Sequence, residues 1–145
     1  MILYLDTSAL LKKYFKEPGS AEVMGSWKEA KGIVTSAVAY AETLASIYRK
    51  KREVTINAKV FGTILGSFRR DWRSFIRVEV SDDLNETIDK IVDDYPLRGS
   101  DAIHLASALM IDEAVPESLL FACYDKKLTL AAQKAGLQTL PERLE

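Results

Sequence analysis

The chain has 145 residues, of which 48% are hydrophobic and 28% are charged, and its formal net charge is −1. These values are typical of one globular domain and exclude a disordered or fibrous chain. The charge argues against a nucleic-acid binder that depends on bulk electrostatic attraction, although a local basic patch stays open.

Short apolar segments alternate with helical patterns along the chain. In chain order we expect a strand at 2–5, a helix at 9–15, a helix that ends near residue 31, a strand at 32–36, helices at 37–52 and 55–75, a strand at 76–80, helices at 81–95 and 101–112, a strand at 119–124 and a helix at 125–135. This alternation predicts an α/β fold whose mainly parallel sheet is covered on both faces. No repeat or linker interrupts the sequence, so we expect residues 1–145 to form a single domain.

Three further features of the sequence bear on the cellular compartment of the protein. One cysteine excludes an internal disulfide and favours a reducing compartment. The first apolar run carries no basic leader and stops at Asp6, so we expect no signal peptide. No apolar stretch approaches the roughly 18 residues of a membrane span. We therefore expect a cytoplasmic protein with no membrane partner.

Two aspartates directly follow predicted strands. Asp6 comes after the strand at 2–5, and Asp125 comes after the strand at 119–124. In open α/β sheets, sites form beyond the carboxyl ends of the strands, so parallel strands would bring both carboxylates to one edge. Aspartate is also a good helix N-cap, and capping stays open for each residue taken singly.

Glu42 is the only charged side chain between Ala37 and Tyr48. A helix that is apolar on nearly every face is expected to be buried. An unpaired carboxylate there is costly unless a proton, a partner or a metal neutralises it. We favour a functional role, and the alternative is a structural ion pair or a side chain that reaches the edge of the helix.

Asp101 opens another helix with little polar surface, at 101–112. A first-turn aspartate complements the helix dipole, which contributes about 0.3–1 kcal/mol. Ser100 would cap the same helix equally well, which weakens this structural explanation for Asp101. We therefore expect Asp101 to join the other three acids in a site.

Four carboxylates in one cleft would repel one another and stay partly protonated unless cations balanced them. Mg²⁺ and Mn²⁺ prefer carboxylate oxygens and keep several waters. One or two such ions suit phosphoryl chemistry, because they polarise a phosphate oxygen and lower the pKa of the attacking water. The sequence offers no His/Cys cluster for zinc, no glycine-rich phosphate loop and no recognisable Ser–His–Asp arrangement.

Four short motifs carry these acids: Leu5-Asp6-Thr7-Ser8-Ala9-Leu10, Ala41-Glu42-Thr43, Gly99-Ser100-Asp101-Ala102-Ile103-His104-Leu105-Ala106 and Phe121-Ala122-Cys123-Tyr124-Asp125-Lys126-Lys127-Leu128. In this order and spacing they resemble the PIN domain family, over essentially the whole chain. Length and order look most like the VapC-type toxins of type II toxin–antitoxin pairs. Cys123 is a departure, since the family often has Ser or Thr two residues before the last aspartate.

The resemblance implies a three-layer α/β/α fold and a Mg²⁺- or Mn²⁺-dependent endoribonuclease. It places the family's acidic quartet on Asp6, Glu42, Asp101 and Asp125, with Asp6 and Asp101 as the firmest metal ligands. Ser8 falls on a hydroxyl position that would hydrogen-bond near the site. The resemblance also implies a homodimer and a small antitoxin as the protein partner.

Several other polar residues lie close to the acids in sequence. His104 follows Asp101 by one helical turn, and we favour a hydrogen-bonded core histidine over a catalytic base. The basic run at 49–52 closes a helix, where positive charge complements the dipole, and we prefer this explanation to RNA contact. Better candidates for contacts with RNA phosphates are Lys12, Lys13, Arg98, Lys126 and Lys127.

The leading prediction is hydrolysis of an RNA phosphodiester by in-line attack of metal-activated water, with release of a 3′-hydroxyl. The alternatives are a PIN-type nuclease in RNA maturation or DNA processing and a catalytically inactive PIN-like binding module. An aspartyl-phosphate phosphatase is a further alternative, because Asp6 ends a first strand. That chemistry normally needs a second aspartate two residues later, where this chain has Ser8.

Overall fold

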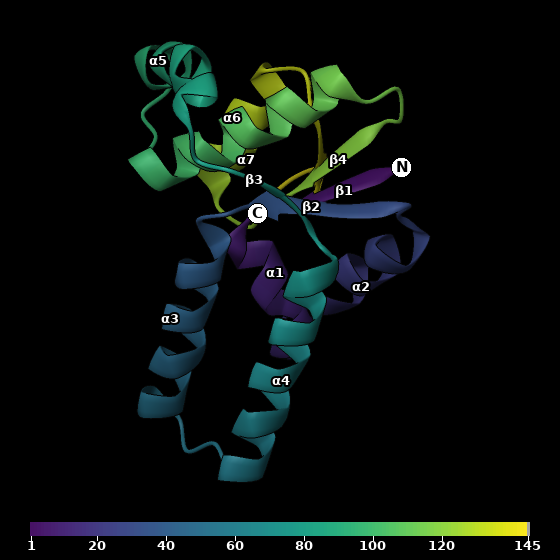
Figure 1. The fold of residues 1–145 in the computed structure, drawn as a ribbon, viewed down its shortest axis with the longest axis vertical. Coiled ribbons are helices and arrows are strands. Elements are labelled where there is room, and N and C mark those ends of the chain that lie inside the picture. Colours follow the sequence, from purple (N-terminus) through teal and green to yellow (C-terminus); the bar gives the residue numbers. More distant parts are fainter. Residues whose placement is uncertain (145) are drawn as a thin grey trace.

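A computed structural model describes residues 1–144 as five strands, seven α-helices and one short 3₁₀ helix (Figure 1). The strands are β1 (Ile2–Leu5), β2 (Gly32–Ser36), β3 (Ile76–Val78), β4 (Leu119–Ala122) and β5 (Gln138–Leu140). The helices are α1 (Thr7–Tyr14), α2 (Ser20–Glu29), α3 (Ala39–Glu53), α4 (Ala58–Ser74), η1 (Asp82–Leu84), α5 (Asn85–Asp94), α6 (Gly99–Ala114) and α7 (Lys126–Lys134).

The strands form one parallel sheet in the order β3-β2-β1-β4-β5, with helices on both faces (Figure 1). Side chains along β1 alternate between the two faces, as the pleat of a strand requires. Ile2 and Tyr4 pack into a core with α5, α6 and α7. Leu3 and Leu5 pack into a second core with α1, α2, α3 and α4. The predicted three-layer α/β/α fold with a parallel sheet is therefore confirmed.

The strand order places a topological switch point between β1 and β4. From β1 the chain builds the sheet outward through β2 and β3, and it later returns to the other side of β1 as β4. At such a point the connections leave in opposite directions and open a crevice beyond the carboxyl ends of the strands. Asp6 follows β1 at once, and Asp125 follows β4 by three residues. Both acids therefore reach the same crevice.

Some element boundaries differ from the predicted ones. The strands β3 and β4 each end two residues earlier than predicted, at Val78 and Ala122. Strand β5 was not predicted, because a three-residue edge strand has no apolar run to mark it. Helix α6 begins at Gly99. The first hydrogen bond of the helix runs from the Ala102 backbone N–H to the Arg98 carbonyl. Ser100 therefore lies inside the helix, so the cap that the sequence allowed at this residue does not form.

The expectation that the helix around Glu42 is buried on nearly every face is also wrong. In α3 only Ala39, Thr43 and Ile47 are buried, and the side chain of Tyr48 is 37% exposed. The helix packs against α1 and α4, and Ala41, Ala45 and Arg49 are exposed to solvent. Within residues 1–144, no helix is both long enough and apolar enough to cross a lipid bilayer.

Candidate active site

An open cleft of about 530 Å³ lies beyond the carboxyl ends of β1 and β4. Residues from α1, α3, α6 and the segment after β4 line it. The cleft brings together all four acids that the sequence predicted: Asp6, Glu42, Asp101 and Asp125. It also contains Ser8, Arg98 and His104. Residues more than a hundred positions apart in the chain therefore share one surface.

Asp6 is both a helix cap and part of the cleft. Its Oδ1 accepts hydrogen bonds from the Ala9 backbone N–H, at 2.9 Å, and from the Ser8 hydroxyl, at 2.7 Å. The residue is only 5% exposed. Burial raises the pKa of the Asp6 carboxyl above its ordinary value, an effect that these hydrogen bonds only partly offset. A nearby cation would favour its ionised form.

Ser8 links the two sides of the switch point. Its hydroxyl donates to Asp6, and its oxygen accepts a hydrogen bond from the Tyr124 backbone N–H at 2.9 Å. The first turn of α1 is thereby tied to the segment that carries Asp125. This contact accounts for a small hydroxyl two residues after Asp6.

Asp125 has the same double arrangement at the start of α7. Its Oδ1 accepts from the Leu128 backbone N–H at 2.9 Å, as an N-cap does. The Cys123 sulfur accepts a hydrogen bond from the Asp125 backbone N–H at 3.3 Å. Cys123 is buried, and burial raises the pKa of its thiol. A neutral thiol thus takes the acceptor role that a Ser or Thr hydroxyl would have in this turn.

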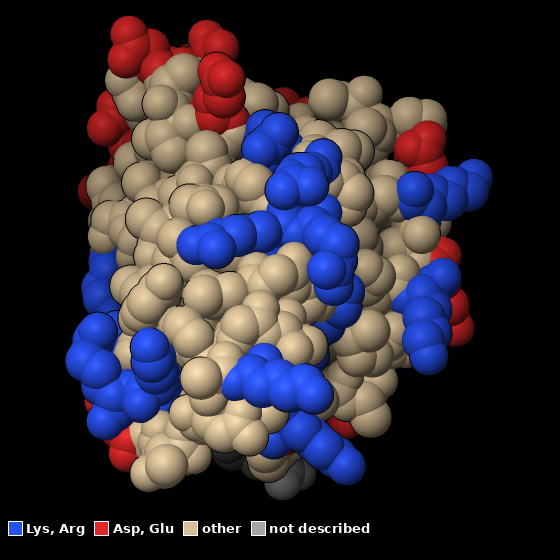
Figure 2. Space-filling model, turned by 60° about the horizontal axis from the view of Figure 1, so that its bottom comes forward, with Lys and Arg blue, Asp and Glu red and all other residues tan. Residues whose placement is uncertain are grey.

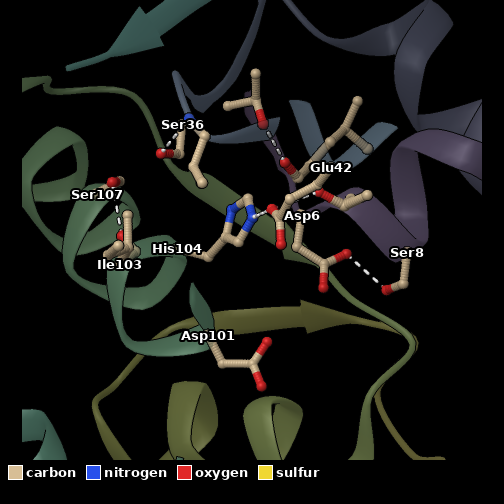
Figure 3. A network of polar contacts seen from close by, with 12 residues as sticks. Asp6, Ser8, Ser36, Glu42, Asp101, Ile103, His104 and Ser107 are labelled. Carbon is tan, nitrogen blue, oxygen red and sulfur yellow. Dashed lines mark hydrogen bonds and ion pairs between the residues drawn. The ribbon is translucent and has the colours of Figure 1, made fainter. Parts of the chain in front are cut away.

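Glu42 projects from the first turn of α3 and is held through one oxygen. The Thr7 hydroxyl donates to Oε1 at 2.8 Å, and His104 Nε2 lies 2.9 Å from the same atom. Figure 3 shows His104 and Glu42 pointing toward each other beside Asp6. Burial alone would raise the pKa of Glu42, but the contacts with His104 and Thr7 outweigh it and lower that pKa.

Asp101 lies in the first turn of α6 and is 9% exposed. Its Oδ2 accepts a hydrogen bond from Arg98 Nε at 3.1 Å. The Arg98 side chain is itself 77% exposed, so its guanidinium remains available to a ligand from solvent. Contact with Asp101 raises the pKa of Arg98, which therefore stays positively charged.

The four carboxylates share a pattern. In each, one oxygen is engaged by the protein, and the second accepts no hydrogen bond from any nitrogen or hydroxyl of residues 1–144. Among those residues, Thr43 Oγ1 is the one buried side-chain oxygen or nitrogen without a partner, so the second carboxylate oxygens open onto the cleft. Oxygens in this state are suitable ligands for a hard divalent cation.

In the described part of the chain, no three acidic, histidine or cysteine side chains lie close enough together to hold a metal ion by themselves. A Mg²⁺ or Mn²⁺ ion here would therefore take one or two carboxylates from the protein and its other ligands from water or substrate. An open set of oxygens fits Mg²⁺ or Mn²⁺, which keep several waters. It does not fit structural zinc, which takes four tight nitrogen or sulfur ligands.

His104 was expected to be a hydrogen-bonded core residue, and its burial confirms this. It is 2% exposed, and both ring nitrogens have partners, Tyr4 at Nδ1 and Glu42 at Nε2. It nevertheless touches an acid of the cleft, which the sequence did not indicate. Thr7 was also missed. Its hydroxyl contacts Glu42 across 35 positions of the sequence, and no local pattern indicates such a contact.

The structure separates the predicted RNA-contacting cations into two groups. Arg98 lines the cleft, and Lys126 and Lys127 line an adjoining hollow of about 270 Å³ that shares Asp101 and Asp125 with it. The remaining two lysines point elsewhere: Lys12 pairs with Glu17 at 3.2 Å, and Lys13 pairs with Asp71 at 2.5 Å. Arg49, which we had assigned to helix stabilisation, lines the cleft.

Comparison with known proteins shows the family to which the chain belongs. The model of the PIN domain family matches residues 3–132. The chain belongs to the PIN domain family. The phosphatase alternative is therefore set aside, and the hydroxyl of Ser8 stands bonded to Asp6 where a second aspartate would be needed.

One sequence relative and two solved structures match this chain over most of its length. Ribonuclease VapC45 of Mycobacterium tuberculosis (strain CDC 1551 / Oshkosh) is 29% identical, over 99% of this chain and 98% of that protein. The structure of FitAB bound to an IR36 DNA fragment has a TM-score of 0.69 at 17% identity, covering 100% of this chain and 98% of that one. A toxin–antitoxin complex from Klebsiella pneumoniae has a TM-score of 0.61 at 18% identity, covering 86% and 88%.

Proposed function

We propose that this PIN domain is a Mg²⁺- or Mn²⁺-dependent endoribonuclease and the toxin of a toxin–antitoxin pair. The observation that carries the proposal is the set of four carboxylates that each turn one free oxygen to the same cleft. The ribonuclease activity named for the relative from Mycobacterium tuberculosis supports RNA as the substrate. The match to a toxin–antitoxin complex supports the biological role.

The residues of the cleft divide the work of phosphodiester hydrolysis. One or two divalent ions, when bound by these carboxylates, would supply Lewis acidity. The two most buried acids, Asp6 and Asp101, would be the firmest ligands. Glu42 and Asp125 are more exposed, and they would bind directly or through water and orient the attacking water. Arg98 places positive charge beside Asp101, where it neutralises a phosphate oxygen during in-line attack and release of the 3′-hydroxyl.

A local basic surface supports RNA as the substrate despite the net charge of −1. Figure 2 shows Lys and Arg side chains gathered across the middle of one face, with the Asp and Glu side chains toward its edges. Around the cleft the cations are Arg49, Arg98, Lys126 and Lys127. We assign the phosphate contacts to these four residues, and we no longer include Lys12 and Lys13, which already have acidic partners.

The proposal also includes two protein partners and a location. We propose a small antitoxin and a second copy of the chain as partners, and the cytoplasm as the location. An apolar groove between the end of α1 and the α3–α4 hairpin, with Val54 and Val60 exposed beside it, offers a surface for a protein partner. Induced expression should arrest growth, and co-expression of the cognate antitoxin should restore it. Light scattering of the purified protein measures whether it is a dimer.

The decisive experiment is cleavage of RNA by purified protein with Mg²⁺ or Mn²⁺, with EDTA as the metal-free condition. Asp6→Asn and Asp101→Asn should each lower kcat by at least about a hundredfold, because each removes a charged ligand oxygen. Asp89→Asn, an exposed acid on α5, is the matched control and should cut like the wild type. Undiminished cleavage by Asp6→Asn or in EDTA would overturn the proposal, and preference for DNA would favour the DNA-processing alternative.

A further inference from the structure

Three side chains, of which Tyr4 and His104 are buried and Glu42 is half-buried, form a line from the sheet to the cleft. The Tyr4 hydroxyl on β1 lies 2.9 Å from His104 Nδ1 on α6, and His104 Nε2 lies 2.9 Å from Glu42 Oε1 on α3. Tyr4 is fully buried and His104 is 2% exposed. Figure 3 shows the contact between His104 and Glu42 as a dashed line. The line joins three elements that are otherwise far apart in the chain.

The hydrogens of this line can be assigned by counting donors and acceptors. An ionised carboxylate only accepts, so the contact with Glu42 requires a hydrogen on His104 Nε2. In a neutral ring with that hydrogen, Nδ1 is an acceptor, and the Tyr4 hydroxyl must donate to it. Burial raises the pKa of Tyr4, so its hydroxyl keeps the hydrogen that this role needs. For a neutral ring, this is the one arrangement that satisfies all three groups.

The arrangement also explains which oxygen of Glu42 is free. Oε1 receives both Thr7 and His104, whereas Oε2 accepts no hydrogen bond from a nitrogen or hydroxyl within residues 1–144. We propose that Tyr4 holds His104 in the Nε2–H tautomer, and that His104 thereby fixes Oε1 of Glu42 and presents Oε2 to the cleft. Tyr4 and His104 are then positioning residues. The inference rests on the proposed function in taking Glu42 as part of the active site.

This role differs from general-base catalysis by histidine. Both ring nitrogens of His104 already have protein partners, so neither is free to take a proton from a substrate water. Residues that orient a metal ligand in this way commonly change metal affinity or activity by about 10- to 100-fold when they are replaced.

His104 is the only histidine of the chain, so a long-range ¹H–¹⁵N NMR spectrum of the metal-free protein reports its tautomer without assignment. We expect a hydrogen on Nε2 and none on Nδ1 at neutral pH. In Tyr4→Phe, the loss of the donor to Nδ1 should let the second tautomer appear. A hydrogen on Nδ1 in the wild type, or a Tyr4→Phe spectrum unchanged from it, would overturn the inference.

Kinetics and Mn²⁺ titration test the effect on Glu42. Tyr4→Phe and His104→Leu should lower kcat and Mn²⁺ affinity by about 10-fold or more, with little change in KM for RNA. His104→Gln should recover most of the loss, because its amide both donates and accepts. Tyr14→Phe removes another buried tyrosine hydroxyl, one bonded to Asp71 away from the cleft, and should leave both quantities unchanged. Equal values for His104→Leu and the wild type would overturn the inference.

A failure of the ribonuclease proposal can be distinguished from a failure of this inference. A wild type that cuts no RNA with Mg²⁺ or Mn²⁺ would overturn the ribonuclease assignment. The tautomer spectrum would still decide whether Tyr4 and His104 hold Glu42 as described, because it is recorded without metal or substrate.

Discussion

At the scale of single residues, Asp6 and Asp125 each perform two tasks with the two oxygens of one carboxylate. One oxygen caps a helix, and the other faces the cleft. The sequence offered capping and catalysis as alternatives for these residues, and the geometry allows both at once. The cap also serves the cleft, because the bonds to Oδ1 hold the side chain in a single orientation.

Asp6→Asn separates these two tasks. Asparagine caps a helix as well as aspartate does, so α1 should remain intact. Removing a buried charge whose pKa is raised should stabilise the metal-free protein at pH 7, because the folded state no longer has to bury an ionised carboxylate. Urea unfolding in EDTA measures this gain.

The pH dependence of that gain has a definite sign. Asp6 binds its proton more tightly in the folded than in the unfolded state, so the wild type gains stability as the pH falls through the folded pKa. The advantage of Asp6→Asn should therefore shrink toward acidic pH. Saturating Mn²⁺ should reverse the order, because only the wild type binds it well. Equal stability of the two proteins at pH 7 in EDTA would contradict this reasoning.

Cys123 gives a second prediction for a single residue. Cys123→Ser keeps an acceptor for the Asp125 backbone N–H, so RNA cleavage should stay within about threefold of the wild type. Cys123→Val has a similar volume but no acceptor, and it should cost about 1–3 kcal/mol of stability. Urea unfolding and kcat measured on both variants test the pair. A valine variant as stable as the serine variant would show that the sulfur contact is unimportant.

At the scale of secondary structure elements, periodicity predicted the order of strands and helices, and it failed where local signals are weak. The strand at Gly32–Ser36 was predicted to the residue, because glycine and a polar pair bound its apolar run. Strand β5 has no such run and forms by pairing with β4. The exposed face of α3 was missed because its alanines are apolar in sequence and yet too small to require burial.

The acids that gather in the cleft could be predicted from the sequence, and so could Ser8 beside Asp6, but their partners from distant parts of the chain could not. Position after a strand marked Asp6 and Asp125, and an apolar helix marked Glu42, so each signal was local. The contact of His104 with Glu42 spans 62 positions, and that of Ser8 with Tyr124 spans 116. Such pairs follow from how the elements pack, and no short motif records them. Arg49 lines the cleft, which its place near a helix end did not indicate.

The contact between α1 and α4 allows a prediction at the same scale. Asp71 on α4 accepts from Lys13 at 2.5 Å and from the Tyr14 hydroxyl at 2.7 Å. Asp71→Ala leaves both donors without a partner and should destabilise the protein by about 1–3 kcal/mol, whereas Tyr14→Phe should cost about 1 kcal/mol. Urea unfolding measures both, and kcat of the folded proteins should match the wild type. A loss of activity beyond the loss of folded protein would place this contact in the site.

At the scale of the whole molecule, the charges are segregated. The chain is slightly acidic overall, but one face carries a concentration of Lys and Arg (Figure 2). Acidic side chains within the cleft and basic ones around it suit a ligand that is itself negative and arrives with divalent cations. Binding should then depend on a few definite contacts, since the molecule has no excess positive charge.

This distribution predicts a shallow dependence of RNA affinity on salt. Each phosphate neutralised on a single strand contributes a slope of about −0.7 in log K against log salt, so Arg49, Arg98, Lys126 and Lys127 together give about −3. Binding is measured in the Asp6→Asn background, which should not cut the RNA. Replacing Lys126 and Lys127 by glutamine should reduce the slope by about 1.4.

Two neighbouring arginines on α4 provide the control for the replacement of Lys126 and Lys127. Arg69 and Arg70 are neighbouring exposed cations that do not line the cleft, so their replacement by glutamine should leave the slope unchanged. A larger effect from the α4 pair than from Lys126 and Lys127 would mean that RNA crosses a different face.

The order of the strands governs when the cleft comes into existence. Because β1 is the middle strand, one of its edges stays unpaired until β4 docks against it. Strand β4 follows most of the helices in the chain. Asp6 and Asp125 therefore meet only when the last third of the protein docks onto the first few residues. A partly made or partly unfolded chain lacks the completed pocket, so the ability to damage RNA arises in one late step.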